Sequence, residues 1–185
     1  LKSTFINLKI KNFYSFKYKE YLTSPQFIHP VHCPSIELWL IWCEKIHLLK
    51  ISSEISNYEW YCWYDAGLAK YRKRRDNLPT TKWPNEQKMD LLQKNKINVT
   101  HKSDKYICGT SYIIHRDFII EFHKMFYDVI DEYIIQKKNI DLKLKNNGNF
   151  ESITDQTILT YLYINNPDKF NILVEGFGEN IDYLA

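Results

Sequence analysis

The segment EWYCWYDAGLAKYRKRR (Glu59–Arg75) places a single acidic residue directly after a run of large apolar side chains. Five aromatic or cysteine residues precede Asp65, and such a short, bulky stretch is typical of a buried strand. Ala66 and Gly67 then allow a tight turn or a close approach of the backbone to a ligand. Asp65 is therefore expected at the carboxyl end of a strand, which is where open α/β sheets bind ligands.

An acid in this position has three possible roles. It can hold a divalent cation that bridges a diphosphate, because Mg²⁺ and Mn²⁺ prefer oxygen ligands. It can act as a general base. It can also cap the following turn, and the local pattern of Asp65 taken alone favours this structural role.

A cluster of cations follows the turn, made up of Lys70, Arg72, Lys73, Arg74 and Arg75. These side chains suit phosphate groups, with arginine favoured for bidentate contacts, but a solvated loop is the commoner fate of a charge run. Basic residues beside aromatic ones also suit single-stranded nucleic acid. The net charge of +3 is small for such a protein and disfavours a nucleic-acid partner.

Flanking segments predict an alternation of helices and strands, which indicates an α/β sheet covered on both faces. Helices are expected after the N-cap Ser35, after Trp83-Pro84 and in two later segments with helical spacing. The ranges are helix 36–51, strand 59–64, helix 84–93, strand 105–114, helix 115–137, helix 152–167 and strand 170–174. Residues 1–34 form a poorly defined N-terminal segment, with one stray strand and a long loop.

Two further segments carry candidate site residues. Gly109 and Thr110 interrupt a strand, which indicates either close passage of a ligand or another backbone, or a bulge. Asp155 and Gln156 open a helix, where Asp155 can complement the helix dipole. If that helix end faces a ligand site, the pair instead offers a carboxylate and an amide to sugar hydroxyls. The turn into the helix at His115 is also expected at the carboxyl edge of the sheet.

Composition bounds the class of protein. A chain of 185 residues with 44% hydrophobic content suits one domain, residues 1–185. The four cysteines lack the close spacing of a zinc site and favour a reducing compartment, so a cytoplasmic location is expected. No apolar run has the length of a membrane span. The chain starts at Leu1, which is compatible with a fragment or a processed form.

Several of these segments together resemble the HtrL/YibB family of bacterial proteins, which is linked with surface-polysaccharide and lipopolysaccharide gene clusters. The segments are IELWLIWCEKIHLL (36–49), YEWYCWYDAGLAKYR (58–72), KWP (82–84), KYICGTSYIIHRDFIIEFHKMF (105–126) and ITDQTILTYLYINNPDKF (153–170). The resemblance covers roughly residues 30–175, and the order of the motifs carries it more than any single one. The residues that fit the central motif are Trp63, Asp65, Ala66, Gly67 and Arg72.

The family is similar to nucleotide-sugar glycosyltransferases of the GT-A fold, an α/β domain with a mixed central sheet flanked by helices. The resemblance implies transfer of a sugar from a nucleotide-sugar donor to a glycan or other hydroxyl acceptor in polysaccharide biosynthesis. It implies Mn²⁺ or Mg²⁺ on Asp65, and Asp155 and Gln156 near the acceptor and reaction centre. The donor- and substrate-binding residues that it implies are Trp63, Asp65, Ala66, Gly67, Lys70, Arg72, Gly109 and Thr110.

In that scheme Lys70 or Arg72, with the cation on Asp65, neutralises the departing diphosphate, and Asp155 is the base if the reaction inverts the sugar. The alternative is a non-catalytic GT-A-like binding or scaffold protein, because Gly67 stands where the second acid of the Asp-x-Asp motif of GT-A enzymes is expected. The segment 1–34 also lacks the opening strand and turn that hold a nucleotide base, so the chain is expected to lack its first βαβ piece or the pocket. A nucleic-acid-binding module is the third alternative.

Overall fold

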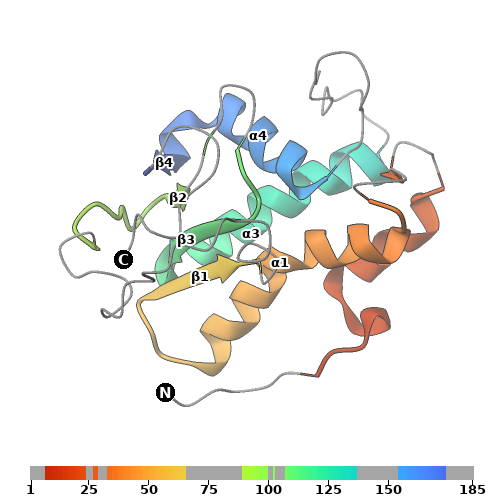
Figure 1. Ribbon diagram of the computed structural model, residues 1–185, viewed down its shortest axis with the longest axis horizontal. Coiled ribbons are helices and arrows are strands. Elements are labelled where there is room, and N and C mark those ends of the chain that lie inside the picture. The colour runs from red at the N-terminus through yellow and green to blue at the C-terminus, as the bar shows by residue number, and fades with distance from the viewer. Residues whose placement is uncertain are drawn as a thin grey trace, which may run out of the picture.

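The computed structural model describes residues 7–23, 27–28, 33–65, 89–99, 102, 107–136 and 154–173. These residues form a mixed α/β structure in which three long helices pack beside a small sheet (Figure 1). The helices are α1 (Ile36–Ile55), α3 (Arg116–Ile130) and α4 (Asp155–Asn165), with short helical turns η1 (Ile10–Asn12), η2 (Tyr14–Tyr21), η5 (Asp131–Ile135) and η6 (Pro167–Lys169). The strands are β1 (Trp60–Tyr64), β2 (Ile97–Val99), β3 (Ser111–His115) and β4 (Phe170–Ile172).

The described sheet has four strands in the order β1-β3-β2-β4, and it is mixed. Strand β3 runs antiparallel to both of its neighbours, with Trp60 opposite His115 and Tyr64 opposite Ser111. Strands β2 and β4 are parallel. Consequently β1, β2 and β4 all point the same way, and their carboxyl ends share one edge of the sheet with the beginning of β3. The predicted mixed α/β class is confirmed.

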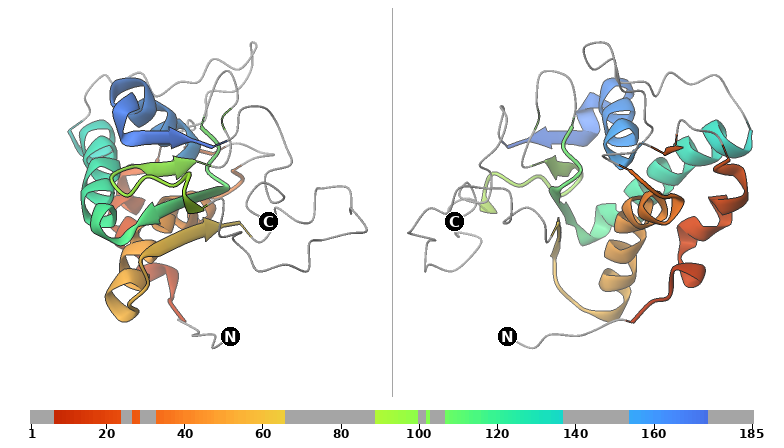
Figure 2. Two further views of the ribbon diagram at one scale, coloured as in Figure 1. Left: turned by 90° about the vertical axis from the view of Figure 1, so that its left-hand side faces the viewer. Right: turned by 45° about the vertical axis from the view of Figure 1, so that its right-hand side comes forward.

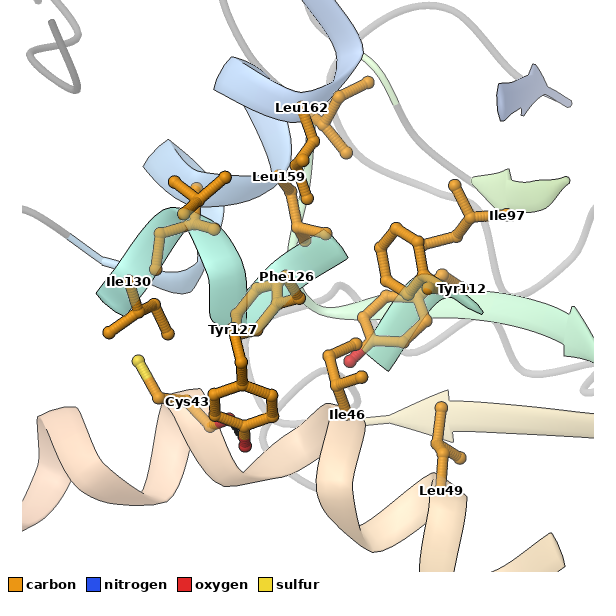
Figure 3. Packing of buried hydrophobic residues seen from close by; sticks show 14 of the residues in the cluster. Cys43, Ile46, Leu49, Ile97, Tyr112, Phe126, Tyr127, Ile130, Leu159 and Leu162 are labelled. Atoms are coloured by element: carbon orange, nitrogen blue, oxygen red, sulfur yellow. Dashed lines mark hydrogen bonds between the residues drawn. The ribbon is translucent and has the colours of Figure 1, made fainter. Parts of the chain in front are cut away.

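The main core lies between the helices and one face of the sheet (Figure 2). Alternate strand residues such as Tyr61, Tyr112 and Ile97 point into it, as the two-residue period of a strand requires. Side chains of α1, α3 and α4 meet them in one continuous cluster (Figure 3). The opposite face carries a small second cluster around Leu92 and Ile113, which includes the helical residue Met89. The helices α1, α3 and α4 pack on the first face, and the expected helical cover of the second face stays a prediction, because most of the helix expected over 84–93 lies outside the described residues.

The N-caps of two helices confirm the local reading of the sequence. The Ser35 hydroxyl accepts a hydrogen bond from the backbone N–H of Leu38 at 3.2 Å, and α1 begins at the next residue after Ser35. Thr154 caps α4. Its hydroxyl accepts a hydrogen bond from the backbone N–H of Thr157, and the Thr157 hydroxyl accepts one from the backbone N–H of Thr154. This reciprocal cap fixes the first turn of α4, where Asp155 is the first helical residue.

The N-terminal segment differs from the expected stray strand. Residues 14–21 form the 3-10 helix η2, which is held against α1 by the buried carboxylate of Glu44. Glu44 accepts hydrogen bonds from the backbone N–H groups of Tyr14 and Ser15 at 3.0 and 2.9 Å. The Glu44 carboxylate thus supplies the acceptors for the start of η2 and satisfies two backbone donors that a 3-10 turn leaves free.

Three element predictions change. Of the strand expected over 105–114, the described residues form an isolated bridge at Ile107, a turn at Gly109 and Thr110, and β3 from Ser111 onward. Strand β2 was not expected. The helix expected over 84–93 lies mostly outside the described residues, and 89–93 contain only turns after Met89. None of the helices within the described ranges has the length and apolarity needed to cross a membrane.

The expected place of His115 is wrong. Because β3 is antiparallel to β1, His115 lies opposite Trp60 at the far end of the sheet from Asp65. The beginning of β3, not its end, reaches the edge where β1 finishes. This reversal brings the Gly109-Thr110 turn beside Asp65.

Candidate functional site

A buried lysine joins the two acidic segments singled out in the sequence. The ammonium of Lys45, on α1, lies 3.1 and 3.2 Å from the two carboxylate oxygens of Asp65 and 2.8 Å from Oδ2 of Asp155. It also donates a hydrogen bond to the carbonyl oxygen of Gly109 at 3.0 Å. The Lys45 side chain is only 5% exposed. We call these four residues, Lys45, Asp65, Gly109 and Asp155, the lysine cage.

Asp65 enters the lysine cage from the carboxyl end of β1. Its backbone N–H donates to the carbonyl oxygen of Thr110 at 2.9 Å, which extends the β1–β3 pairing by one residue. Its Oδ1 accepts a hydrogen bond of 2.6 Å from the indole Nε1 of Trp63. With 28% of its side chain exposed, Asp65 is the member of the ion-paired group that meets solvent. The described contacts of the Asp65 side chain are thus an ion pair and an indole hydrogen bond, while the turn that it was expected to cap lies outside the described residues.

Asp155 enters from the other side, at the first turn of α4. Its side chain is 8% exposed, so the carboxylate is almost wholly removed from water. Its Oδ2 is close to the Lys45 ammonium, but the approach is poorly aligned, and no described residue offers this buried oxygen a well-directed hydrogen bond. The charge of Asp155 is therefore offset by the ammonium of Lys45 in the interior of the protein.

The shape of the cage explains why residue 109 is glycine. A Cβ added at Gly109 would lie 2.6 Å from Oδ2 of Asp155 and 3.1 Å from its Cγ. No ordinary side chain can occupy that position while Asp155 stays in place. The sequence indicated that a ligand or another backbone passes close to Gly109. In the structure, the group that lies against Gly109 is the carboxylate of Asp155.

Burial and charge oppose each other inside the cage. Burial alone would lower the pKa of Lys45, but Asp155 and Asp65 together outweigh it and raise that pKa, so the ammonium stays charged. Burial raises the pKa of Asp155 above its usual value, and the attraction of Lys45 offsets only part of this effect. Asp155 is therefore a stronger base than an exposed aspartate, which is the property that proton transfer near neutral pH requires.

The oxygens of the cage do not fit a metal ion while Lys45 is in place. Both Asp65 oxygens contact the ammonium, and Oδ1 also holds the Trp63 indole. A divalent cation on Asp65 would lie within a few ångströms of a buried positive charge, which is strongly unfavourable at low dielectric. Across the described ranges, no group of three His, Cys, Asp or Glu side chains is close enough to hold a metal.

The structure brings together most of the described residues that the sequence marked. Asp65, Trp63, Gly109, Thr110 and Asp155 all lie at this edge. Gln156 is half-buried, one residue further into α4. The Thr110 hydroxyl is 2.9 Å from Sγ of Cys108, so it is engaged within its own turn. The remaining marked residues lie outside the described ranges: Ala66, Gly67, Lys70 and Arg72.

Lys45 is the residue that sequence reasoning missed. It stands with Glu44 inside the apolar helix segment IELWLIWCEKIHLL, at positions where α1 is buried on a wide face. Charged residues are almost never fully buried unless they are paired. A sequence signal for Lys45 was therefore present, because two adjacent charged residues in a buried helix each require a partner. The partner of Glu44 is the backbone of η2, and the partners of Lys45 are the other members of the lysine cage.

Comparisons of this chain with protein-family models, with curated proteins and with solved structures found no match. The interpretation therefore rests on the geometry of the cage and on the sequence motifs.

Proposed function

We propose that this chain is a glycosyltransferase domain that moves a sugar from a nucleotide-sugar donor to a hydroxyl group of a glycan or another acceptor. The observation that carries the proposal is the convergence of Asp65 and Asp155 on one ammonium. These acids are far apart in the sequence, and the resemblance implies one at the donor and the other at the reaction centre. Their meeting at a single edge supports one shared site.

The fold is compatible with this proposal. A mixed sheet with a strand ending in an acid, and a late helix whose first turn carries a second acid, are the features that the resemblance to GT-A transferases implies. Both acids lie at the carboxyl edge of β1, where sheets of this class bind ligands. The GT-A assignment itself remains part of the proposal.

The proposed reaction uses Asp155 as the base. The acceptor oxygen forms a bond to the anomeric carbon of the donor, the bond from that carbon to the diphosphate breaks, and the acceptor proton passes to Asp155. Burial raises the pKa of Asp155, which makes its carboxylate a stronger base and suits it to take this proton. The nucleoside diphosphate leaves with the bonding electrons.

Asp65 has a different role in this proposal. Its two oxygens remain tied to Lys45 and Trp63, yet the side chain is partly exposed. An ionised carboxylate fixed in this way accepts hydrogen bonds from sugar hydroxyls at a set position. Neutralisation of the departing diphosphate falls to Lys70 or Arg72, which stays a prediction.

A second candidate function has an observation in its favour. Asp155 is nearly buried and both acids are already paired with Lys45, an arrangement that also serves to fix a fold. A binding or scaffold protein with a transferase-like sheet would keep this cage and bind no donor.

Calorimetric titration of the full chain with UDP-, GDP- and CMP-sugars separates the two functions. The glycosyltransferase proposal expects one donor class to bind, and Asp65→Asn to weaken that binding about tenfold or more through the lost carboxylate. Asp90→Asn, at an exposed acid away from the cage, is the matched control and should bind like the wild type. Absence of binding to every donor, with and without Mn²⁺, would reject the transferase and leave the scaffold.

A further inference from the structure

We infer that Lys45 is the resident cation of this site, and that its ammonium occupies the place of a divalent metal ion among the oxygens of the lysine cage. The inference concerns which cation the site holds, and it is argued from the geometry of the cage alone. Only the consequence that a sugar donor would bind without a divalent metal ion rests on the proposed function.

The first argument is the set of atoms around the ammonium. Its neighbours are two oxygens of Asp65, one of Asp155 and the carbonyl of Gly109, at 2.8–3.2 Å. Carboxylate and carbonyl oxygens are the ligands that Mg²⁺, Mn²⁺ and Ca²⁺ prefer. The cage is thus an oxygen site of metal-binding chemistry that is filled by a side chain.

The second argument is charge. Two carboxylates face one another across the cage, and Asp155 is nearly buried. Like charges this close destabilise one another unless a cation lies between them. Lys45 supplies a single positive charge between them, within 2.8–3.2 Å of oxygens of both acids.

The third argument is space. Gly109 leaves no room for a side chain against Asp155, so the cage is closed on that side by backbone. The oxygen ligands of Mg²⁺ and Ca²⁺ lie about 2.0–2.6 Å from the ion. Removal of the Lys45 amine would therefore leave a cavity whose oxygens, now 2.8–3.2 Å from the nitrogen, need to move inward by about 1 Å or less to reach a metal ion.

The inference has two consequences. The wild-type protein should need no divalent metal at Asp65, in contrast to the expectation from the resemblance. Truncation of Lys45 should convert the cage into a divalent-cation site, formed by Asp65, Asp155 and the Gly109 carbonyl.

Manganese binding, followed by electron paramagnetic resonance and by thermal shift, tests the inference without any sugar donor. Wild-type protein and Lys45→Ala are titrated with Mn²⁺ alone, and Lys50→Ala serves as the control for loss of a lysine from the same helix. We expect Lys45→Ala to bind Mn²⁺ at least about tenfold more tightly than the wild type and the control. The gain should disappear in Lys45→Ala/Asp155→Asn.

Two results would overturn the inference. One is Mn²⁺ binding by the wild type that Asp65→Asn abolishes, and the other is folded Lys45→Ala that binds Mn²⁺ no better than the wild type. If Lys45→Ala folds poorly, refolding with Mn²⁺ decides: the inference expects a higher folded yield, and an unchanged yield contradicts it. A donor that fails to bind would reject the proposed function and leave these results untouched.

Discussion

At the scale of single residues, the burial of Lys45 is the unusual feature of this protein. Burying an ammonium costs several kcal/mol unless close acceptors replace water, and here two carboxylates and a carbonyl do so. The pair Lys50–Glu54 on the same helix is exposed, and an ordinary surface ion pair of this kind adds little stability. The two lysines therefore form a natural comparison.

Replacement of Lys45 by methionine should destabilise the fold strongly at pH 7, by about 3 kcal/mol, because it leaves Asp155 and Asp65 without their counter-charge. Urea denaturation measures the loss, and Lys50→Met should change stability by less than about 0.5 kcal/mol. Burial raises the pKa of Asp155, and in the variant Lys45 no longer opposes this effect, so the folded state binds a proton on Asp155 more tightly than the unfolded state. Its stability deficit should consequently shrink as the pH falls towards 5. A deficit that is equal at both pH values would contradict the assigned role of the ammonium.

Gly109 offers a second test at this scale. Gly109→Ala should destabilise the protein by about 1–3 kcal/mol, because the new methyl group would overlap Oδ2 of Asp155. The cost should be clearly smaller in an Asp155→Ala background, where that oxygen is gone. A double-mutant cycle measures this coupling. Additive losses would show that the glycine serves the backbone and not the carboxylate.

At the scale of elements, α1 makes polar contacts with η2, with the edge of the sheet and with α3. Glu44 binds the start of η2, Lys45 binds the sheet edge, and His47 faces α3. Nδ1 of His47 lies 3.0 Å from Nε2 of His123, and Tyr14 stacks on the His47 ring. One imidazole must be the acceptor in this contact, so the pair requires at least one neutral ring.

This histidine contact predicts a pH dependence. Burial lowers the pKa of His123 to about 4 and also lowers that of His47, in both cases below the ordinary value. A group with a depressed folded pKa that is neutral when deprotonated stabilises the fold above its unfolded pKa. This stability should therefore be lost as the pH falls from about 6.5 towards 4. Urea midpoints across this range should fall less steeply in His123→Gln, and identical slopes would contradict the contact.

At the scale of the whole molecule, local signals predicted the elements better than their arrangement. Caps and helical spacing identified α1, α3 and α4, and the aromatic run identified β1. Strand β2 was missed because it has three residues with Asn98 at its centre, which reads as polar. Asn98 is buried, and its amide donates to the carbonyl oxygens of Gln93, Lys96 and Ile113. Only the tertiary structure supplies those acceptors.

The candidate site shows the same division. Asp65, Gly109 and Asp155 could each be marked from local sequence, because an acid after a strand and a glycine within one are conspicuous. Their contact with one shared cation could not be predicted from local sequence. It depends on the antiparallel direction of β3, which brings Gly109 beside Asp65, and no local pattern encodes that direction. The resemblance placed a metal ion where the fold places Lys45.

Turnover of the donor tests the central claim most directly. The full chain is incubated in EDTA with the nucleotide sugar that it binds, and release of the nucleoside diphosphate is followed with and without acceptor glycans. We predict release without added metal, and a loss of at least about 10²-fold in Asp155→Asn, since a general base contributes this much. Asp90→Asn should keep the wild-type rate. Absence of turnover by the wild type, or an unchanged rate in Asp155→Asn, would contradict the account.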